Sequence, residues 1–386
     1  MSSATLIGIS ATSGVPLFIR HSGPGKAPPY ALIASLNGAH VFGDAQGVTL
    51  WKADSDTSRV VWKTFHDSIR LILIRGSECS GEFVDHILLE LAFASLIFLN
   101  GLNNLVSQNN VERLKKDLRP CYPMLDEILA RGLGNREGLF SHLTKCVDYI
   151  LPPDQLNIQP ELDKYTESIE SSYGCLLLTS GQILFATKSF WNLTRTELVL
   201  LPLFLSSKPY NSSVGRDIPI YLPDRSPNTP FRMLVTLLAG PLLLISLCGP
   251  SVSLNEAMKS ASTFWGSHYL TLDAIVMSTM CSIPVSIHST LDKAVLGLLL
   301  INYDTKRCLS CVHFREKGEN RLTNSPRGSK STAYKENVLA SVYRSIINHI
   351  PTQAYITTDD FKVFVLQKSS YHFLVLFPSL LPLHIA

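Results

Sequence analysis

The stretch TLIGISATSGVPLFIR, residues 5–20, decides the fold, because it begins an order of elements that returns twice along the chain. Thr5 to Ala11 is apolar and partly β-branched, Ser13-Gly14 follows, and Val15 to Arg20 is apolar again. Two such runs around a glycine turn predict a β-hairpin. The periodicity beyond the hairpin predicts one helix, three strands and two helical segments. Their expected ranges are Tyr30–Asn37, Val48–Lys52, Arg59–Phe65, Ile69–Arg75, Glu82–Leu99 and Asn104–Arg119, the first helix stopping at Gly38.

The same ββ-α-βββ-αα order returns after a proline-rich joint. A second hairpin is predicted around Ser180-Gly181 and a third around Asn302-Tyr303-Asp304. In the third pass Pro378 and Pro382 interrupt the last residues, so we expect that copy to lack its closing helix. The prediction is an α+β protein of three α/β/α sandwiches, each with a five-stranded antiparallel sheet. The expected domains are residues 1–150, 151–290 and 291–386.

The composition indicates a large core and a weakly charged surface. Hydrophobic residues make up 46% of the 386 and charged residues 17%, with a net charge of +3. Such a charge gives no global attraction to nucleic acid. The first 20 residues lack a signal-peptide pattern, and eight cysteines are scattered, so reduced thiols in the cytosol are expected. Gly240-Pro241 interrupts the apolar run Met233–Cys248, which favours two buried strands over a membrane span. We expect the apolar run Phe83–Leu99 to be a largely buried core helix.

No motif carries chemistry by itself. Phosphate loops, nucleophile elbows and zinc-protease motifs are absent from the sequence. Cys308 and Cys311 form a CxxC inside an expected strand, with His313 as the one nearby ligand, and structural cysteines are favoured over a metal site. His66-Asp67 lies between two expected strands, where a turn is favoured over a catalytic pair. We expect no catalytic residue, metal or cofactor.

Two surfaces are candidates for partners. The segment Asn110–Arg119 places Val111, Leu114 and Leu118 on one helical face. Its cations Arg113, Lys115, Lys116 and Arg119 are either a solvated face or a patch for acidic lipids or an acidic protein. The expected helix Tyr30–Asn37 is apolar and nearly uncharged, so a partner could cover its second face.

Several stretches resemble the Fuzzy planar cell polarity effector family. They span nearly the whole chain: Ser13 to Phe18, Ser35 to Gly38, Val61 to Lys63 with Phe65 to Ile69, Asn110 to Arg119, Cys146 to Asp148 with Pro152-Pro153, Tyr221 to Pro223 with Ser226-Pro227, Leu247 to Pro250, and Gly297 to Leu300 with Lys306 to Leu309. The resemblance implies three longin domains. It also implies a cytoplasmic protein of the cytoskeleton and ciliary basal body, with a role in planar polarity, cilium assembly, Hedgehog signalling and vesicle trafficking.

The resemblance implies partners as well. Fuzzy proteins pair with Inturned and a WD-repeat planar polarity effector, and the Fuzzy–Inturned pair resembles exchange factors that load GTP onto Rab-family GTPases. Carried over by structure, the partner-binding positions are Ala31, Ser35, Asn37, His40, Val48 and Leu50. The family's C-terminal helix has no counterpart in Pro378 to Ala386. A longin-type trafficking adaptor without exchange activity, and a metalloprotein using Cys308, Cys311 and His313, remain alternatives.

Overall fold

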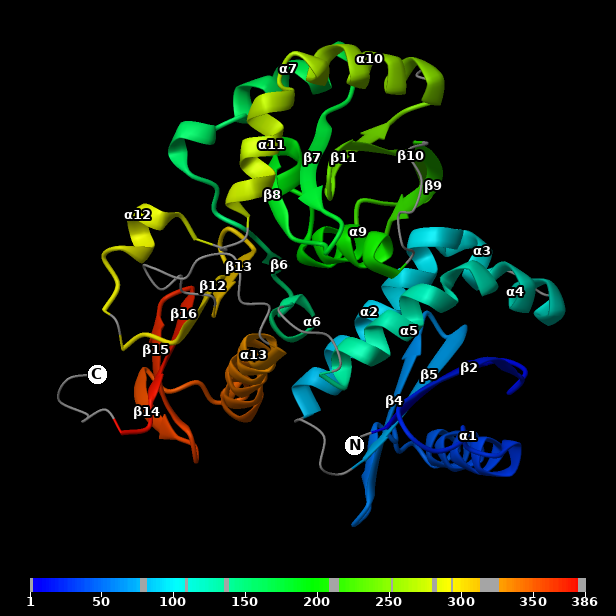
Figure 1. Ribbon diagram of the computed structural model, residues 1–386. Helices are drawn as coiled ribbons and strands as arrows, with labels where there is room; N and C mark the ends of the chain where they lie inside the picture. Colours follow the sequence, from blue (N-terminus) through cyan, green and yellow to red (C-terminus); the bar gives the residue numbers. More distant parts are fainter. Residues whose placement is uncertain are drawn as a thin grey trace. The chain divides into compact units, whose positions relative to one another are not determined.

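The computed structural model contains three β-sheets, each with helices packed on it (Figure 1). It describes residues 3–76, 82–107, 110–134, 139–207, 215–250, 253–279, 283–292, 294–312 and 326–380. The chain forms two compact units, one of residues 1–135 with 219–230 and one of residues 136–218 with 231–386. The first sheet belongs to the first unit and the third sheet to the second unit.

The first sheet has five antiparallel strands in the order β2-β1-β5-β4-β3. The strands are β1 (Ala4–Ser10), β2 (Pro16–Ser22), β3 (Lys52–Asp54), β4 (Ser58–Phe65) and β5 (Ile69–Gly76). Helix α1 (Tyr30–Ala45) covers one face, and α2 (Glu82–Asn100) and α5 (Tyr122–Gly132) cover the other (Figure 1). The short helices α3 (Leu102–Val106), α4 (Val111–Asp117) and η1 (Arg119–Cys121) lie between α2 and α5 in sequence.

Alternation along the strands gives this sheet two apolar faces. Ile7 of β1, Trp62 of β4 and Ile72 of β5 form a buried cluster with Ile33 of α1. The alternate residues of the same strands point to α2 on the other face. There Phe65 of β4 stacks on Phe93 of α2, with ring centroids 4.2 Å apart. A sheet covered on both faces needs such apolar residues at successive positions.

The structure corrects three predicted elements in the first domain. Helix α1 does not stop at Gly38 but continues to Ala45, because one glycine is tolerated inside a helix. The strand expected at Val48–Lys52 is Lys52–Asp54, so Val48 and Leu50 lie in the loop before it. The segment expected to form one helix over Asn104–Arg119 is divided into α3, α4 and η1.

The second sheet repeats the first, with the order β8-β7-β11-β10-β9. Its strands are β7 (Tyr173–Leu178), β8 (Ile183–Ala186), β9 (Arg216–Leu222), β10 (Ser226–Ala239) and β11 (Leu242–Cys248), and its helices are α7 (Gln159–Ser168), α8 (Lys188–Trp191), α9 (Arg195–Ser207), α10 (Leu254–Gly266) and α11 (Tyr269–Ser278). The turn at Gly240 has φ +50°, and β10 and β11 pair across it, so the apolar run is a hairpin as predicted.

The third sheet contains an unexpected sixth strand. Its order is β14-β15-β16-β12-β13-β6, and β6 (Val147–Asp148) runs parallel to β13, whereas five antiparallel strands were expected. The others are β12 (Gly297–Asn302), β13 (Arg307–Cys311), β14 (Gln353–Thr357), β15 (Phe361–Lys368) and β16 (Tyr371–Pro378). Helix α13 (Pro326–Ile346) lies between β13 and β14 in sequence, and α12 (Val285–His288) and α6 (Ser141–Thr144) precede β12. The expectation for residues 381–386 lies outside the described residues.

One described helix segment, Phe83–Asn100 of α2, is long and apolar enough to cross a membrane. However, 72% of it is buried inside the fold, where it packs on β4 and β5. The prediction of a core helix is therefore confirmed.

Candidate protein-binding surface

Helix α1 binds the first sheet along one narrow face. Ile33, Leu36, Asn37 and His40 follow at the three- and four-residue spacing of a helix, and Ile33 and Leu36 pack on the apolar cluster of the sheet. Asn37 and His40 are polar, and buried polar groups need hydrogen-bond partners, which the sheet must supply.

Arg70 of β5 supplies these partners. Its guanidinium donates to Asn37 Oδ1 at 2.8 Å and to Thr64 Oγ1 at 3.1 Å, and lies 3.6 Å from Asp44. His40 Nδ1 lies 2.9 Å from Asp44 Oδ2. Burial and the charge of Arg70 lower the pKa of His40, so the neutral ring is favoured at physiological pH. The polar groups of α1 therefore fix the helix to its own sheet.

The opposite side of α1 is exposed and uncharged. Ala31, Ser35, Gly38 and Phe42 follow at helical spacing, are all exposed, and are called here the outer face of α1. The Phe42 side chain is 69% exposed, and Leu32 and Val41 beside the outer face are 44% and 48% exposed. Asp44 is the one Asp, Glu, Lys or Arg in the helix, and it is engaged by His40 and Arg70. Grouped exposed apolar side chains of this kind mark protein-binding surfaces.

A Schellman motif ends α1 and is followed by the exposed residue Val48. The Val48 N–H donates to Gly43 O at 2.9 Å and the Gly47 N–H donates to Asp44 O at 3.0 Å. Gly47 has φ +73°, which favours glycine. A Cβ on Gly43 would lie 2.8 Å from Val48 O, so a side chain there would disturb the turn. The Val48 side chain is 60% exposed.

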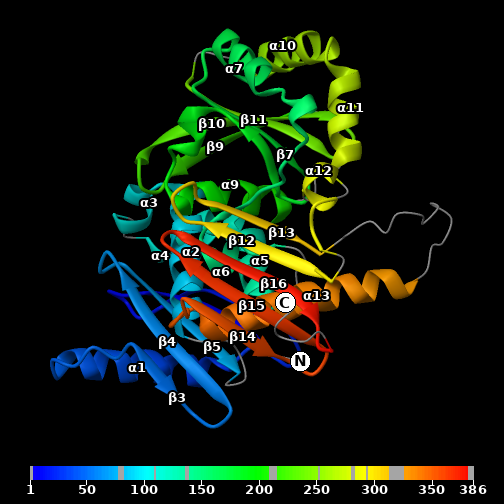
Figure 2. The same ribbon diagram turned by 90° about the vertical axis from the view of Figure 1, so that its left-hand side faces the viewer.

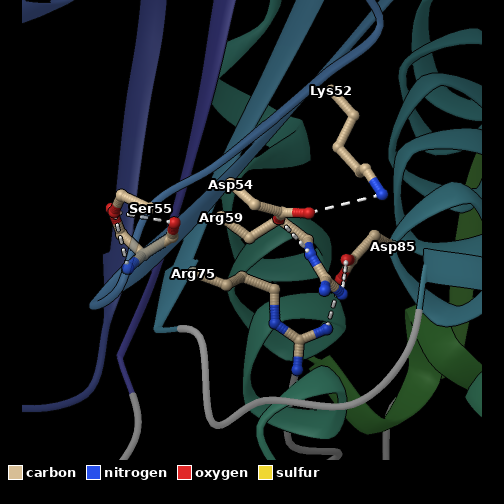
Figure 3. A network of polar contacts seen from close by, with 7 residues as sticks. Lys52, Asp54, Ser55, Arg59, Arg75 and Asp85 are labelled. Carbon is tan, nitrogen blue, oxygen red and sulfur yellow. Dashed lines mark hydrogen bonds and ion pairs between the residues drawn. The ribbon is translucent and has the colours of Figure 1, made fainter.

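Strand β3 lies at the edge of the sheet, where it pairs with β4 in the described part of the chain. Lys52 Nζ lies 3.3 Å from Asp54 Oδ2, and Arg59 of β4 donates to Asp54 Oδ1 at 2.7 Å (Figure 3). The short edge strand is therefore held by charge as well as by its ladder. Figure 2 shows β3 beside β4 and on the side of the first domain that also carries α1.

The same network continues into the core. Arg59 Nη1 lies 3.6 Å from Asp85 Oδ2, and Arg75 donates to Asp85 Oδ1 at 2.7 Å (Figure 3). Arg75 also donates to the carbonyl oxygen of Gly132 at 3.0 Å. Asp85 and Arg75 are 1% and 3% exposed, and burial raises the pKa of Asp85 against the opposing effect of both arginines. A buried pair thus anchors the edge strand to α2.

The residues expected to bind a partner divide into two sets. Ala31, Ser35 and Val48 are exposed, whereas Asn37, His40 and Leu50 face the sheet. That any of them binds a partner stays a prediction. Sequence reasoning missed Phe42 because it ended the helix at Gly38, although Gly47 six residues after Val41 was the available stop signal.

The basic segment is less positive than its cations suggest. Leu114 and Leu118 are buried as predicted, and Arg113, Lys116 and Arg119 are exposed. Lys115 pairs with Glu112 at 2.8 Å and Arg113 lies 3.9 Å from Asp117. Carboxylates within the patch reduce its attraction for an acidic surface, and lipid binding stays a prediction.

The His66-Asp67 pair lies in a turn, and the CxxC motif of Cys308 and Cys311 lies in a strand. His66 and Asp67 have φ values of 49° and 50°, typical of the tight turn that joins β4 and β5. Cys308 and Cys311 are buried in β13, and burial raises the pKa of Cys308 well above its usual range. No group of three or more His, Cys, Asp or Glu residues that could hold a metal occurs in the described ranges, and His313 lies outside them.

Comparison with known proteins gives consistent matches. Residues 6–128 match the model of the first longin domain of FUZ, MON1 and HPS1, and residues 170–266 match that of the second longin domain of the same proteins. The chain is 36% identical over 324 residues to the protein fuzzy homolog of Xenopus tropicalis, covering 84% of this chain and 75% of that protein. It is 38% identical over 313 residues to the human protein fuzzy homolog, covering 80% of this chain and 72% of that protein.

Proposed function

The chain belongs to the Fuzzy family of longin proteins, and from this premise we propose that it is a non-catalytic subunit of a planar cell polarity effector complex. In this proposal it pairs with Inturned through its first longin domain, and the pair promotes nucleotide exchange on a Rab-family GTPase during cilium assembly. A WD-repeat planar polarity effector is the further partner. The site of action is the cytoplasm, at the basal body.

The outer face of α1 is the observation that carries the proposal. A helix that turns Asn37, His40 and Asp44 toward its own sheet and exposes Phe42 has apolar surface left for a second protein. Strand β3 lies at the edge of the sheet in the described part of the chain, where a strand of another protein can extend the sheet. A partner that presents both a helix and an edge strand fits this surface, and a sister longin domain has both.

Exchange needs no catalytic residue in this chain. An exchange factor binds the nucleotide-free GTPase more tightly than the loaded form, so its effect is a shift between states. In this proposal the outer face contacts the sister longin domain, and Phe42 is the largest exposed side chain on that face. We therefore expect Phe42 to contribute most of the binding free energy on this face.

The test is co-purification with Inturned, followed by release of a fluorescent guanine nucleotide from candidate Rab GTPases. We expect a stable complex that accelerates release, and Phe42→Asp to weaken the complex by about tenfold or more. The control is Leu270→Asp, which places the same charge on an 83% exposed side chain of α11. A complex that leaves the release rate unchanged for every Rab would support the adaptor instead, and no complex would refute the pairing.

A further inference from the structure

Strand β3 has backbone groups that point away from its own sheet. The Trp62 N–H donates to Trp51 O at 2.9 Å and the Ser55 N–H donates to Ser58 O at 2.8 Å. Trp51 and Ser55 therefore direct their backbone groups toward β4. Because this direction alternates along an antiparallel strand, the N–H and C=O groups of Lys52 and Asp54 point toward the outer edge.

The side chains at this edge are self-complementary. Lys52 and Asp54 lie two residues apart, so both occur on the same face of the sheet, with Ala53 between them. If a second copy of β3 runs antiparallel about a two-fold axis at Ala53, each Lys52 lies opposite the Asp54 of the other copy. The same register places residues with outward backbone groups opposite each other, which is the arrangement of a hydrogen-bonded pair.

Other two-fold registers of the same strand are unfavourable. An axis at Lys52 would place two lysines opposite each other, and an axis at Asp54 would do the same for two aspartates. Like charges directly opposite each other on paired strands are destabilising. A register shifted by one residue would place a residue whose backbone groups point outward opposite a residue whose backbone groups point toward β4, so hydrogen bonds could not form between them. Charge and backbone geometry thus favour the same register.

We propose that the chain associates with a second copy of itself through antiparallel pairing of β3 about a two-fold axis at Ala53. Lys52 and Asp54 already pair with each other, and Asp54 also pairs with Arg59, and in this register the same two charges face opposite charges of the second copy. Val48, which is 60% exposed, precedes β3 by four residues and supplies uncharged area on the segment that leads into the pairing strand. The charges set the register, and the apolar area supplies affinity.

This dimer does not depend on the exchange activity proposed above. A sister longin domain that uses the same edge would displace the second copy. The self-associated chain would then be the resting form, and partner binding would compete with it. The two proposals can fail independently, because self-association is measured on the chain alone and exchange is measured with Inturned and a Rab GTPase.

The first test is sedimentation of the purified full chain with charge reversals. We expect reversible dimerisation of the parent, and dimers weakened about tenfold or more by Lys52→Asp or Asp54→Lys alone, because each creates two like-charge pairs. An equimolar mixture of the two variants should dimerise like the parent, since every pair across the axis is again opposite in charge. Lys116→Asp, an exposed charge reversal in α4, is the control and should leave dimerisation unchanged.

The second test fixes the register. Opposed residues in a non-hydrogen-bonded pair have Cα atoms about 4.5 Å apart, which a disulfide can bridge. Ala53→Cys should therefore give a covalent dimer on mild oxidation, whereas Asp54→Cys, opposite Lys52 of the other copy, should not. A parent chain that stays monomeric up to about 100 µM, or a variant mixture that stays monomeric, would overturn the proposal. Equal cross-linking of both cysteine variants would overturn the register.

Discussion

Replacing Asp85 by Asn should destabilise the first domain more than the same replacement at a partly exposed carboxylate such as Asp126. The change keeps the size of the side chain and removes its charge. Arg75, 3% exposed and 2.7 Å from Asp85, would then keep its charge in the core while losing the charge of this carboxylate. Arg59 would lose its second carboxylate as well, 3.6 Å away.

The expected cost follows from what remains in place. Breaking one partner of a buried ion pair costs about 3–5 kcal/mol, because the remaining charge is desolvated without compensation. The hydrogen bond from Arg75 to Gly132 O would persist, but one neutral acceptor offsets little of the desolvation free energy of the buried guanidinium. By contrast, the Arg20–Asp126 pair is partly exposed, with side chains 29% and 43% exposed, and its loss should cost about 0–1 kcal/mol.

Hydrogen exchange followed by mass spectrometry measures this cost in the domain itself. Global unfolding of a chain with several domains is not one transition. Peptides from β5 and α2 report the opening of this core separately. A loss of about 3 kcal/mol raises the opening equilibrium of those peptides more than about a hundredfold, and Asp126→Asn should leave them near the parent rate.

A paired replacement separates charge loss from packing loss. Arg75→Met with Asp85→Leu removes both charges, and such exchanges of buried pairs are often neutral or stabilising. We expect the double variant to exchange far more slowly than Asp85→Asn. The reasoning would be refuted if Asp85→Asn were no worse than Asp126→Asn, or if the double variant were as unstable as the single one.

Three further outcomes are expected. Gly43→Ala should cost about 1–2 kcal/mol because its Cβ would lie 2.8 Å from Val48 O, whereas Gly38→Ala, with no atom within 4 Å, should stabilise α1 by up to about 1 kcal/mol, both measured by exchange of α1 amides. The pKa of His40 is lowered by burial, so the unfolded state takes up the proton first and the first domain should lose stability as the pH falls below about 6.5. Protection of α1 amides from exchange, measured at several pH values and corrected for the intrinsic exchange rate, checks this, and His40→Gln should show the flatter profile. Cys308, whose pKa burial raises, should resist alkylation in the native chain and react after unfolding, which mass spectrometry would show.

Local signals explain which parts of the fold could be predicted. The hairpins at Ser13-Gly14 and Gly240-Pro241 have turn residues whose backbone preferences act within a few positions, and both were predicted. The end of α1 was wrong because Gly38 gives the same local signal as Gly47. Only the hydrogen bonds that close the Schellman motif distinguish the two glycines. That error also removed Phe42 from the candidate surface, so the site was predicted less completely than the fold.

Long-range pairing explains what no local signal could show. Val147 N–H donates to Lys306 O at 2.9 Å and Tyr149 N–H donates to Cys308 O at 2.8 Å, so a segment expected to be a simple connection completes the third sheet. The next residue, Ile150, donates to Ile183 O of the second sheet at 2.9 Å.

Side chains reinforce this shared segment. The Arg307 guanidinium lies 4.0 Å from the ring centroid of Trp191 and 4.9 Å from that of Tyr149, and Lys306 Nζ donates to Leu193 O at 2.6 Å. Cation–π contacts of this kind contribute more when the cation is desolvated, and burial lowers the pKa of Arg307. Because the same few residues pair with strands of both sheets, the second and third domains are coupled through backbone hydrogen bonds. A cut at the proline-rich joint near residue 151 would therefore separate residues 147–150 from the two sheets with which they pair, although composition alone marks that joint as a domain boundary.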